Sequence, residues 1–181
     1  MSKIIGIDIS QLAYESTGVA NYLENLVINL IEQDEKNEYV LFFSSLRGKV
    51  SKKIALLSAK QNVRIKTFRF PPYALNFLWN HVHTLPIDTL IGKVDFFLTS
   101  DWTEPPLRSG IKATILYDLI VYKYPQETAA KIVDVQKKKL KWVKKESNFV
   151  FCISEATKKD AEDLLKIDPK KLHVIYPGLT L

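Results

Sequence analysis

Apolar residues along this chain follow two different spacings. Residues 4–9, 39–44 and 148–153 form short, continuous apolar runs, a pattern typical of strands that are buried on both faces. Residues 19–31 instead place apolar side chains three or four positions apart, so that one face of a helix would be apolar. The chain is therefore expected to alternate strands with helices.

The same two patterns, with the Pro and Gly positions, divide the rest of the chain. The expected strands are residues 4–9, 39–44, 63–68, 94–99, 112–117, 148–153 and 172–176. The expected helices are residues 19–31, 50–59, 73–82 and 127–147, a short helix opened by Pro86, and one capped by Ser154. This order predicts an α/β fold with a Rossmann-like, doubly wound, mostly parallel sheet of about seven strands and helices on both faces.

Polar side chains stand at the carboxyl ends of four expected strands. Open parallel sheets bind ligands outside these ends, so we expect the residues to border a cleft. Strand ends can also be polar simply because loops are polar, and that interpretation stays open. The residues concerned are Asp8, Ser10 and Gln11, then Ser100, Asp101 and Trp102, then Tyr117 and Asp118, then Ser154 and Glu155.

The loop before the first helix, "ESTGVANY", carries a single glycine, Gly18. It therefore matches neither the three-glycine dinucleotide fingerprint nor a phosphate loop, which needs Gly-Lys followed by Ser or Thr. The free N–H groups of a helix N-terminus still attract phosphate. Ser16 or Thr17 could instead cap the helix, and both roles can coexist.

The residue content of the chain bears on its cellular compartment and on whether it holds a metal site. Cys152 is the one cysteine of the 181 residues, so no internal disulfide can form, and a reducing cytoplasm is expected, with Cys152 in the core. The opening residues do not resemble a signal peptide, and no run approaches the roughly 20 apolar residues of a membrane span. His81 and His83 are two positions apart and do not share a helix face, so no metal site is expected.

The net charge of +6 favours an acidic partner, and two segments could provide the contact. Residues 68–79 hold five aromatic side chains, which either pack internally or touch a lipid or an acceptor. Residues 131–145 hold seven lysines, which form either a solvated helix face or a contact with an anionic membrane at the inner face of the cell membrane. No recognition motif for nucleic acid is present. The membrane-contact candidates are Trp79, Lys137, Lys138, Lys139 and Lys141.

Four segments in order resemble one known protein family, across nearly the whole chain. They are "GIDISQLAYESTGVANYLENLVINL", "DFFLTSDWTEPPL", "KATILYDLIVYKYPQ" and "FVFCISEATKKDAEDLLKIDPKKLHVIYPG". The first resembles the first strand, glycine loop and first helix of GT-B glycosyltransferases of family 4. The second, third and fourth resemble that family's proline loop, its His-Asp strand and its Ser-Glu-x-Thr segment. The resemblance is to the N-terminal, acceptor-side domain.

The resemblance implies a half of a two-domain enzyme. Residues 1–177 would form the N-terminal domain and residues 178–181 the start of the interdomain linker, with the C-terminal donor-binding domain absent from this chain. The expected reaction is transfer of a sugar, of hexosyltransferase type and with retention, from a nucleotide-diphospho-sugar to a glycan or lipid-linked acceptor in bacterial-type cell-surface polysaccharide synthesis. No metal cofactor is implied. The isolated domain is expected to be inactive.

The resemblance also assigns roles to residues. Ser16, Thr17, Gly18 and Val19 would bind the donor diphosphate, and Tyr117 and Asp118 would be catalytic. The family's second loop glycine, its arginine and its His-Asp histidine are replaced here by Ala20, Asn21 and Tyr117. From their positions, the acceptor-binding candidates are Asp8, Gln11, Asp101, Trp102, Glu104, Ser154 and Glu155.

Two other functions fit the same residues. The chain could be a non-catalytic α/β module that binds a phosphorylated ligand at the helix N-terminus. It could also be a peripheral membrane or interaction domain that uses the aromatic segment and the lysine-rich helix.

Overall fold

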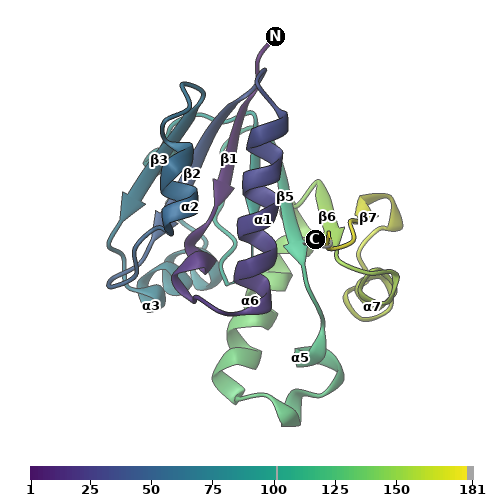
Figure 1. Ribbon diagram of the computed structural model, residues 1–181. Helices are drawn as coiled ribbons and strands as arrows, with labels where there is room; N and C mark the ends of the chain where they lie inside the picture. The colour runs from purple at the N-terminus through teal and green to yellow at the C-terminus, as the bar shows by residue number, and fades with distance from the viewer. Residues whose placement is uncertain (101, 179–181) are drawn as a thin grey trace.

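A computed structural model describes residues 1–100 and 102–178 of the chain. Its centre is one seven-stranded sheet in the order β3-β2-β1-β4-β5-β6-β7, and every neighbouring pair of strands is parallel (Figure 1). The predicted doubly wound α/β fold is thus confirmed, and the sheet is parallel throughout. The strands are β1 (Ile4–Asp8), β2 (Glu38–Ser44), β3 (Val63–Phe68), β4 (Phe96–Thr99), β5 (Ile111–Leu116), β6 (Phe149–Cys152) and β7 (Leu172–Val174).

Strand β2 shows why the central strands are apolar without alternation. Tyr39, Leu41 and Phe43 face one apolar cluster, and the intervening Val40 and Phe42 belong to another on the opposite side. A strand between two helical layers must be apolar on both faces. This explains the continuous run "YVLFF" in the sequence.

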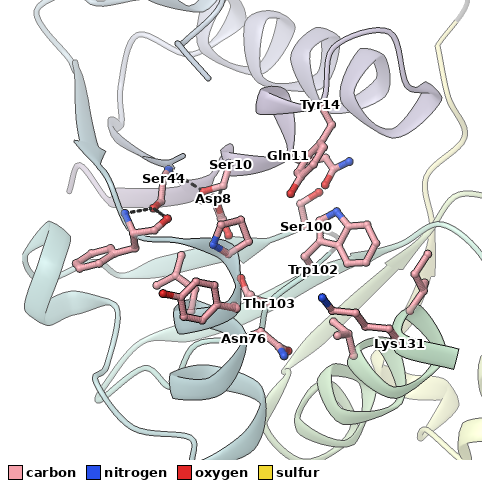
Figure 2. A pocket seen from close by; sticks show the side chains of 16 residues that line it. Asp8, Ser10, Gln11, Tyr14, Ser44, Asn76, Ser100, Trp102, Thr103 and Lys131 are labelled. Atoms are coloured by element: carbon pink, nitrogen blue, oxygen red, sulfur yellow. Dashed lines mark hydrogen bonds between the residues drawn. The ribbon is translucent and has the colours of Figure 1, made fainter. Parts of the chain in front are cut away.

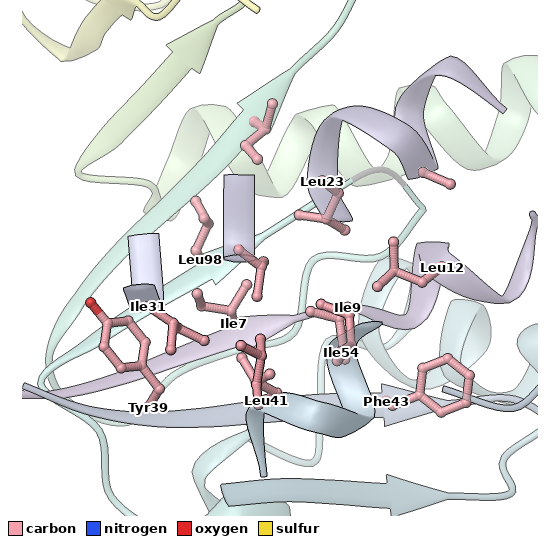
Figure 3. Packing of buried hydrophobic residues seen from close by; sticks show 14 of the residues in the cluster. Ile7, Ile9, Leu12, Leu23, Ile31, Tyr39, Leu41, Phe43, Ile54 and Leu98 are labelled. Carbon is pink, nitrogen blue, oxygen red and sulfur yellow. The ribbon is translucent and has the colours of Figure 1, made fainter. Parts of the chain in front are cut away.

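On the first face, α1 (Gly18–Gln33) and α2 (Lys52–Leu57) pack against the sheet, in front of it in Figure 1. The helical spacing of the sequence buries Leu23, Val27 and Ile31 from α1 against Ile7 of β1. The 3₁₀ turn η1 (Ser10–Ala13) adds Leu12 to the same cluster (Figure 3).

The second face is covered by more irregular helices. They are α3 (Pro72–Leu75), the π-helix η2 (Asn76–His81), α4 (Asp88–Ile91), α6 (Ala130–Glu146) and α7 (Glu155–Leu165). Trp79 is fully buried here against Phe42, with ring centroids 5.6 Å apart. Cys152 lies in this layer's core as expected, and burial raises the pKa of its thiol to about 11. Two further short helical elements are α5 (Ile120–Lys123) and the 3₁₀ turn η4 (Pro169–Lys171).

Side chains of Ser and Thr fix where three helices begin. Thr17, Ser51 and Ser154 accept hydrogen bonds from the backbone N–H groups of Ala20, Ile54 and Thr157, respectively. Each bond satisfies one of the N–H groups that a helix start leaves unpaired. The predicted cap at Ser154 is confirmed.

The long lysine-rich helix differs from its prediction at the N-terminal end. It begins at Ala130 rather than at residue 127, because residues 125–127 form the separate 3₁₀ turn η3 (Pro125–Glu127). Leu140 and Val143 are buried against the sheet. Ile132, at helical spacing from them, is exposed and borders a cavity described below.

A buried ion network joins this helix to the sheet. The Lys112 Nζ of β5 lies 3.2 Å from Glu104 Oε1 and 3.0 Å from Glu146 Oε2. The side chains of Lys112 and Glu104 are 4% and 0% exposed, so water cannot solvate either charge in place of its partner. Glu104 also accepts a 2.7 Å hydrogen bond from the Thr99 hydroxyl.

We expect Lys112→Met to lower the free energy of unfolding by about 3–5 kcal/mol, because it leaves a buried carboxylate without its counter-charge. The matched control is Lys3→Met, which removes the Lys3–Asp95 pair of half-exposed side chains and should cost less than about 1 kcal/mol. Urea denaturation of both variants measures the difference. Equal losses in the two variants would contradict a structural role for the network.

Candidate functional site

The central cavity of the molecule lies where the strand order reverses. Chain connections leave β1 toward β2 on one side and β4 toward β5 on the other, which makes the carboxyl ends of β1 and β4 the switch point at which open α/β sheets bind ligands. A cavity of about 360 Å³ opens there (Figure 2). Its lining comprises Asp8, Ser10, Gln11, Tyr14, Ser44, Phe70, Pro72, Tyr73, Leu75, Asn76, Ser100, Trp102, Thr103, Lys131, Ile132 and Val135.

Asp8 provides a buried carboxylate to this cavity. Burial raises its pKa above the ordinary value, while hydrogen bonds from Ser10 and the positive charge of Lys139 act in the opposite direction. The Ser10 backbone N–H donates to Asp8 Oδ1 at 2.9 Å, and the Ser10 hydroxyl accepts from the Ser44 N–H at 3.0 Å. The ends of β1 and β2 are thereby held together around the carboxylate.

Gln11 and Trp102 line the cavity, and each has a side-chain polar atom without a hydrogen-bond partner among the described residues. These atoms are Gln11 Oε1 and Trp102 Nε1, and both are inaccessible to bulk solvent. Figure 2 shows the two side chains on the same side of the cavity, together with Tyr14. The Tyr14 and Trp102 rings are tilted at 48° with centroids 6.4 Å apart.

The buried network described above sets the position of Trp102. Asn80 of η2 donates from Nδ2 to the Trp102 carbonyl at 2.9 Å and accepts at Oδ1 from the Glu104 N–H at 3.0 Å. The Glu104 carboxylate is in turn held by Thr99 and Lys112. After β4, the backbone is therefore held at Trp102 and Glu104, and the side chain of Glu104 is held as well.

A second, smaller cavity of about 210 Å³ lies beside the first, at the carboxyl end of β5. Tyr117, Asp118 and Val19 line it, and Trp102 and Ile132 line both cavities. The Tyr117 hydroxyl lies 3.1 Å from Ser100 Oγ. Its ring meets Tyr22 edge-on, with centroids 5.6 Å apart. The predicted catalytic pair thus adjoins the cavity that holds Asp8.

The N-terminus of α1 stands next to the second cavity. Thr17 is the residue that caps the helix, which settles the choice between Ser16 and Thr17 as the cap. Ser16 adopts a left-handed backbone conformation with φ of 67°. Gly18 is exposed, and a Cβ added there would meet no atom within 4 Å. The glycine is therefore not required by local packing.

Three of the acceptor-binding candidates line neither cavity, and the position of a fourth is not described. Asp101 is outside the described residues. The prediction for Glu104 is wrong, because its fully buried carboxylate holds the network and lines neither cavity. Ser154 and Glu155 also line neither cavity: Ser154 caps α7, and Glu155 is exposed in the first turn of that helix.

The membrane-contact candidates are corrected in part. The prediction is wrong for Trp79 and Lys139, because both are buried; Trp79 Nε1 donates to the Leu85 carbonyl and Lys139 Nζ to the Ser100 carbonyl. Lys138 is paired with Asp134 at 2.7 Å. The two others lie over aromatic rings, Lys137 over Tyr122 and Lys141 over Trp142.

Sequence reasoning missed several residues that line the central cavity. Ser44 stands at the end of an expected strand and could have been found by the rule that selected Asp8. Tyr14 and Lys131 could not, because only the folded chain brings the turn after β1 and the start of α6 to the same cavity. Asn76 comes from η2, whose irregular winding has no periodic signal.

The described residues contain no group of three or more His, Cys, Asp or Glu side chains that could hold a metal ion. A search of the same residues for a helix long and apolar enough to cross a membrane found none.

Comparison with known proteins adds one match. The family model described as Glycosyltransferase Family 4 matches residues 16–181, which is most of the chain and includes the residues around both cavities except Asp8, Ser10, Gln11 and Tyr14. The comparison with curated proteins gave no match.

Asp8 should make the stability of the fold depend on pH. Its pKa is higher in the folded state than in the unfolded chain, so the folded state binds more protons between the two values. Lowering the pH through the folded-state pKa should therefore raise the stability of the wild type relative to Asp8→Asn. Urea denaturation of both proteins as a function of pH measures this difference. A wild type that loses stability relative to Asp8→Asn as the pH falls would contradict it.

Proposed function

The chain belongs to glycosyltransferase family 4, and we propose that it is the acceptor-binding domain of an enzyme that transfers a sugar from a nucleotide-diphospho-sugar to a glycan or lipid-linked acceptor. The observation that carries the proposal is the central cavity at the switch point, with Asp8 at its base and the Tyr117 cavity beside it. Two adjoining cavities allow an acceptor and a donor sugar to meet near Trp102 and Ile132.

The N-terminus of α1 is the proposed contact with the donor diphosphate. Residues 16–18 are exposed and Val19 lines the second cavity, so the positive end of the helix dipole favours an anion there. Because Gly18 has no side chain, a phosphate oxygen can approach the backbone closely. Charge that develops on the leaving diphosphate would be stabilised without a metal ion.

Tyr117 and Asp118 are proposed to hold the transferred sugar. A tyrosine hydroxyl can donate and accept hydrogen bonds, but it carries no positive charge at neutral pH, unlike the histidine that the family has here. We therefore assign Tyr117 to positioning of the donor sugar through its hydroxyl. Transfer with retention and a role in cell-surface polysaccharide synthesis are part of the proposal and follow from the family alone.

The donor nucleotide is proposed to bind mainly to a second domain, in the same polypeptide or in another chain. The reading frame that encodes this sequence should be expressed in full and incubated with radiolabelled nucleotide sugars and a membrane extract as acceptor. Transfer of label to a glycan or lipid by the full product, and none by residues 1–181, is the expected result. Binding of phosphorylated ligands without transfer by either protein would favour a non-catalytic module instead.

Gly18→Val should separate the role of residue 18 in binding from its role in folding. A Cβ added at residue 18 meets no atom within 4 Å and the position is exposed, so the free energy of unfolding of the domain should change by less than about 0.5 kcal/mol. Transfer by the full product should fall about 100-fold, because the valine holds the diphosphate away from the helix N-terminus.

Leu56→Val is the matched control, since it places the same side chain at an exposed position of α2. It should leave both stability and transfer unchanged. A large loss of stability in Gly18→Val, measured by thermal unfolding, would mean that residue 18 serves the fold rather than the donor.

A further inference from the structure

The central cavity has two chemically different sides. Polar groups line its inner end, where Asp8, Ser10, Ser44 and Ser100 lie at the carboxyl ends of three strands. Apolar groups line the other side, and the segment from Phe70 to α3 supplies most of them. These apolar lining residues are Phe70, Pro72, Tyr73, Leu75, Ile132 and Val135.

The inner end holds an unmatched donor and an unmatched acceptor. Gln11 is 6% exposed, and its Oε1 has no partner among the described residues, as is true of Trp102 Nε1. Leaving such groups buried without partners costs about 1–3 kcal/mol each. A ligand hydroxyl would satisfy both, because it donates one hydrogen bond and accepts others. The rings of Tyr14 and Trp102 next to it offer faces for the C–H groups of a sugar.

The carboxylate of Asp8 disfavours a phosphate at this inner end, although the positive charge of the buried Lys139 offsets part of the repulsion. Among its described lining residues, Asp8 and Lys131 are the charged ones, and the carboxylate of Asp8 is the buried member. An anion beside Asp8 would be repelled across a medium of low dielectric constant. Lys131 is exposed at the start of α6. A neutral polyol therefore fits the inner end.

The apolar side continues onto the surface. Tyr73 lines the cavity and is 74% exposed, and Phe77, in the helical segment that follows, is 56% exposed. Large aromatic side chains at the mouth of a cavity are typical of a contact with an apolar group of a ligand.

We propose that the acceptor of this glycosyltransferase is an amphiphile: a sugar hydroxyl bonds Gln11 Oε1 and Trp102 Nε1, and an apolar group attached to the sugar lies along Phe70, Pro72 and Leu75 and leaves past Tyr73. This rests on the proposed function, in which the central cavity binds the acceptor. It narrows the acceptor class from glycans and lipid-linked acceptors to neutral glycosides that carry an alkyl, polyprenyl or similar apolar group.

The three tryptophans provide a direct test by NMR. The indole N–H groups of Trp79 and Trp142 donate to the carbonyls of Leu85 and Asn80, so a ligand in the cavity should shift the Trp102 indole signal and leave theirs in place. Residues 1–181 are titrated with hexyl β-glucoside, β-galactoside and β-mannoside, each beside its methyl counterpart, and with hexyl phosphate. Trp102→Phe assigns the signal.

At least one hexyl glycoside should give a saturable Trp102 shift, with a Kd at least tenfold lower than that of its methyl counterpart, because the hexyl chain buries additional CH₂ groups. Hexyl phosphate should bind at least tenfold more weakly than that glycoside. Equal affinity for methyl and hexyl glycosides, tighter binding of hexyl phosphate, or no saturable shift at Trp102 would each overturn the proposal.

Two variants test the contacts of the sugar and of the apolar group separately. Gln11→Leu keeps a similar volume and removes the acceptor oxygen, so it should weaken hexyl glycoside binding at least tenfold while the thermal unfolding temperature stays the same or rises. Tyr73→Ala should reduce the advantage of hexyl over methyl glycosides. Tyr124→Ala, an exposed tyrosine that lines neither cavity, is the control and should change neither value.

The same compounds distinguish this inference from the proposed function. If the full product transfers sugar to methyl and hexyl glycosides equally well, the amphiphilic acceptor is wrong and the proposed transferase stands. If hexyl glycosides bind as expected but no nucleotide sugar supports transfer, the transferase is wrong and the amphiphile-binding cavity stands.

Discussion

The contact between Lys112 and Glu104 is the interaction on which the binding region depends. It joins β5 to the loop after β4, and through Glu146 it also holds the end of α6. Since both side chains are withdrawn from water, each charge is stable only while the other is present. The same Glu104 backbone meets Asn80, which holds the Trp102 carbonyl. A structural ion pair thereby fixes an aromatic side chain that two cavities share.

Much of the fold could be predicted from the sequence, but a smaller part of the candidate site. Continuous apolar runs identify strands covered on both faces, and the polar residues that follow them include Asp8, Gln11 and Trp102, which do line the central cavity. Burial of polar groups was harder to predict. Glu104 stands after the end of a strand, as the other polar candidates do. No local pattern in the sequence reveals that its carboxylate is buried and neutralised by Lys112. Trp79 likewise stands in an aromatic segment that looks surface-exposed until Phe42 is seen beneath it.

The candidate site combines a network of buried hydrogen bonds and ion pairs with polar groups that lack partners. The pKa of Asp8 is raised by burial, and two polar atoms at Gln11 and Trp102 lack partners among the described residues. Each of these features opposes folding, and each is useful for binding a polar ligand away from water. Native folds retain such groups mainly where function requires them. The unsatisfied groups therefore make this edge of the sheet the candidate site of a chain that belongs to glycosyltransferase family 4.

Trp102 and Ile132 belong to the linings of both cavities. A smaller side chain at either position would enlarge both spaces together, so neither residue can be altered to accept a new substrate on one side alone. Independent variation has to fall on residues that line a single cavity, such as Tyr73 for the central one and Val121 for the smaller one. If both cavities bind substrates as proposed, the shared wall makes their substrate ranges evolve together unless change is confined to residues that line one cavity.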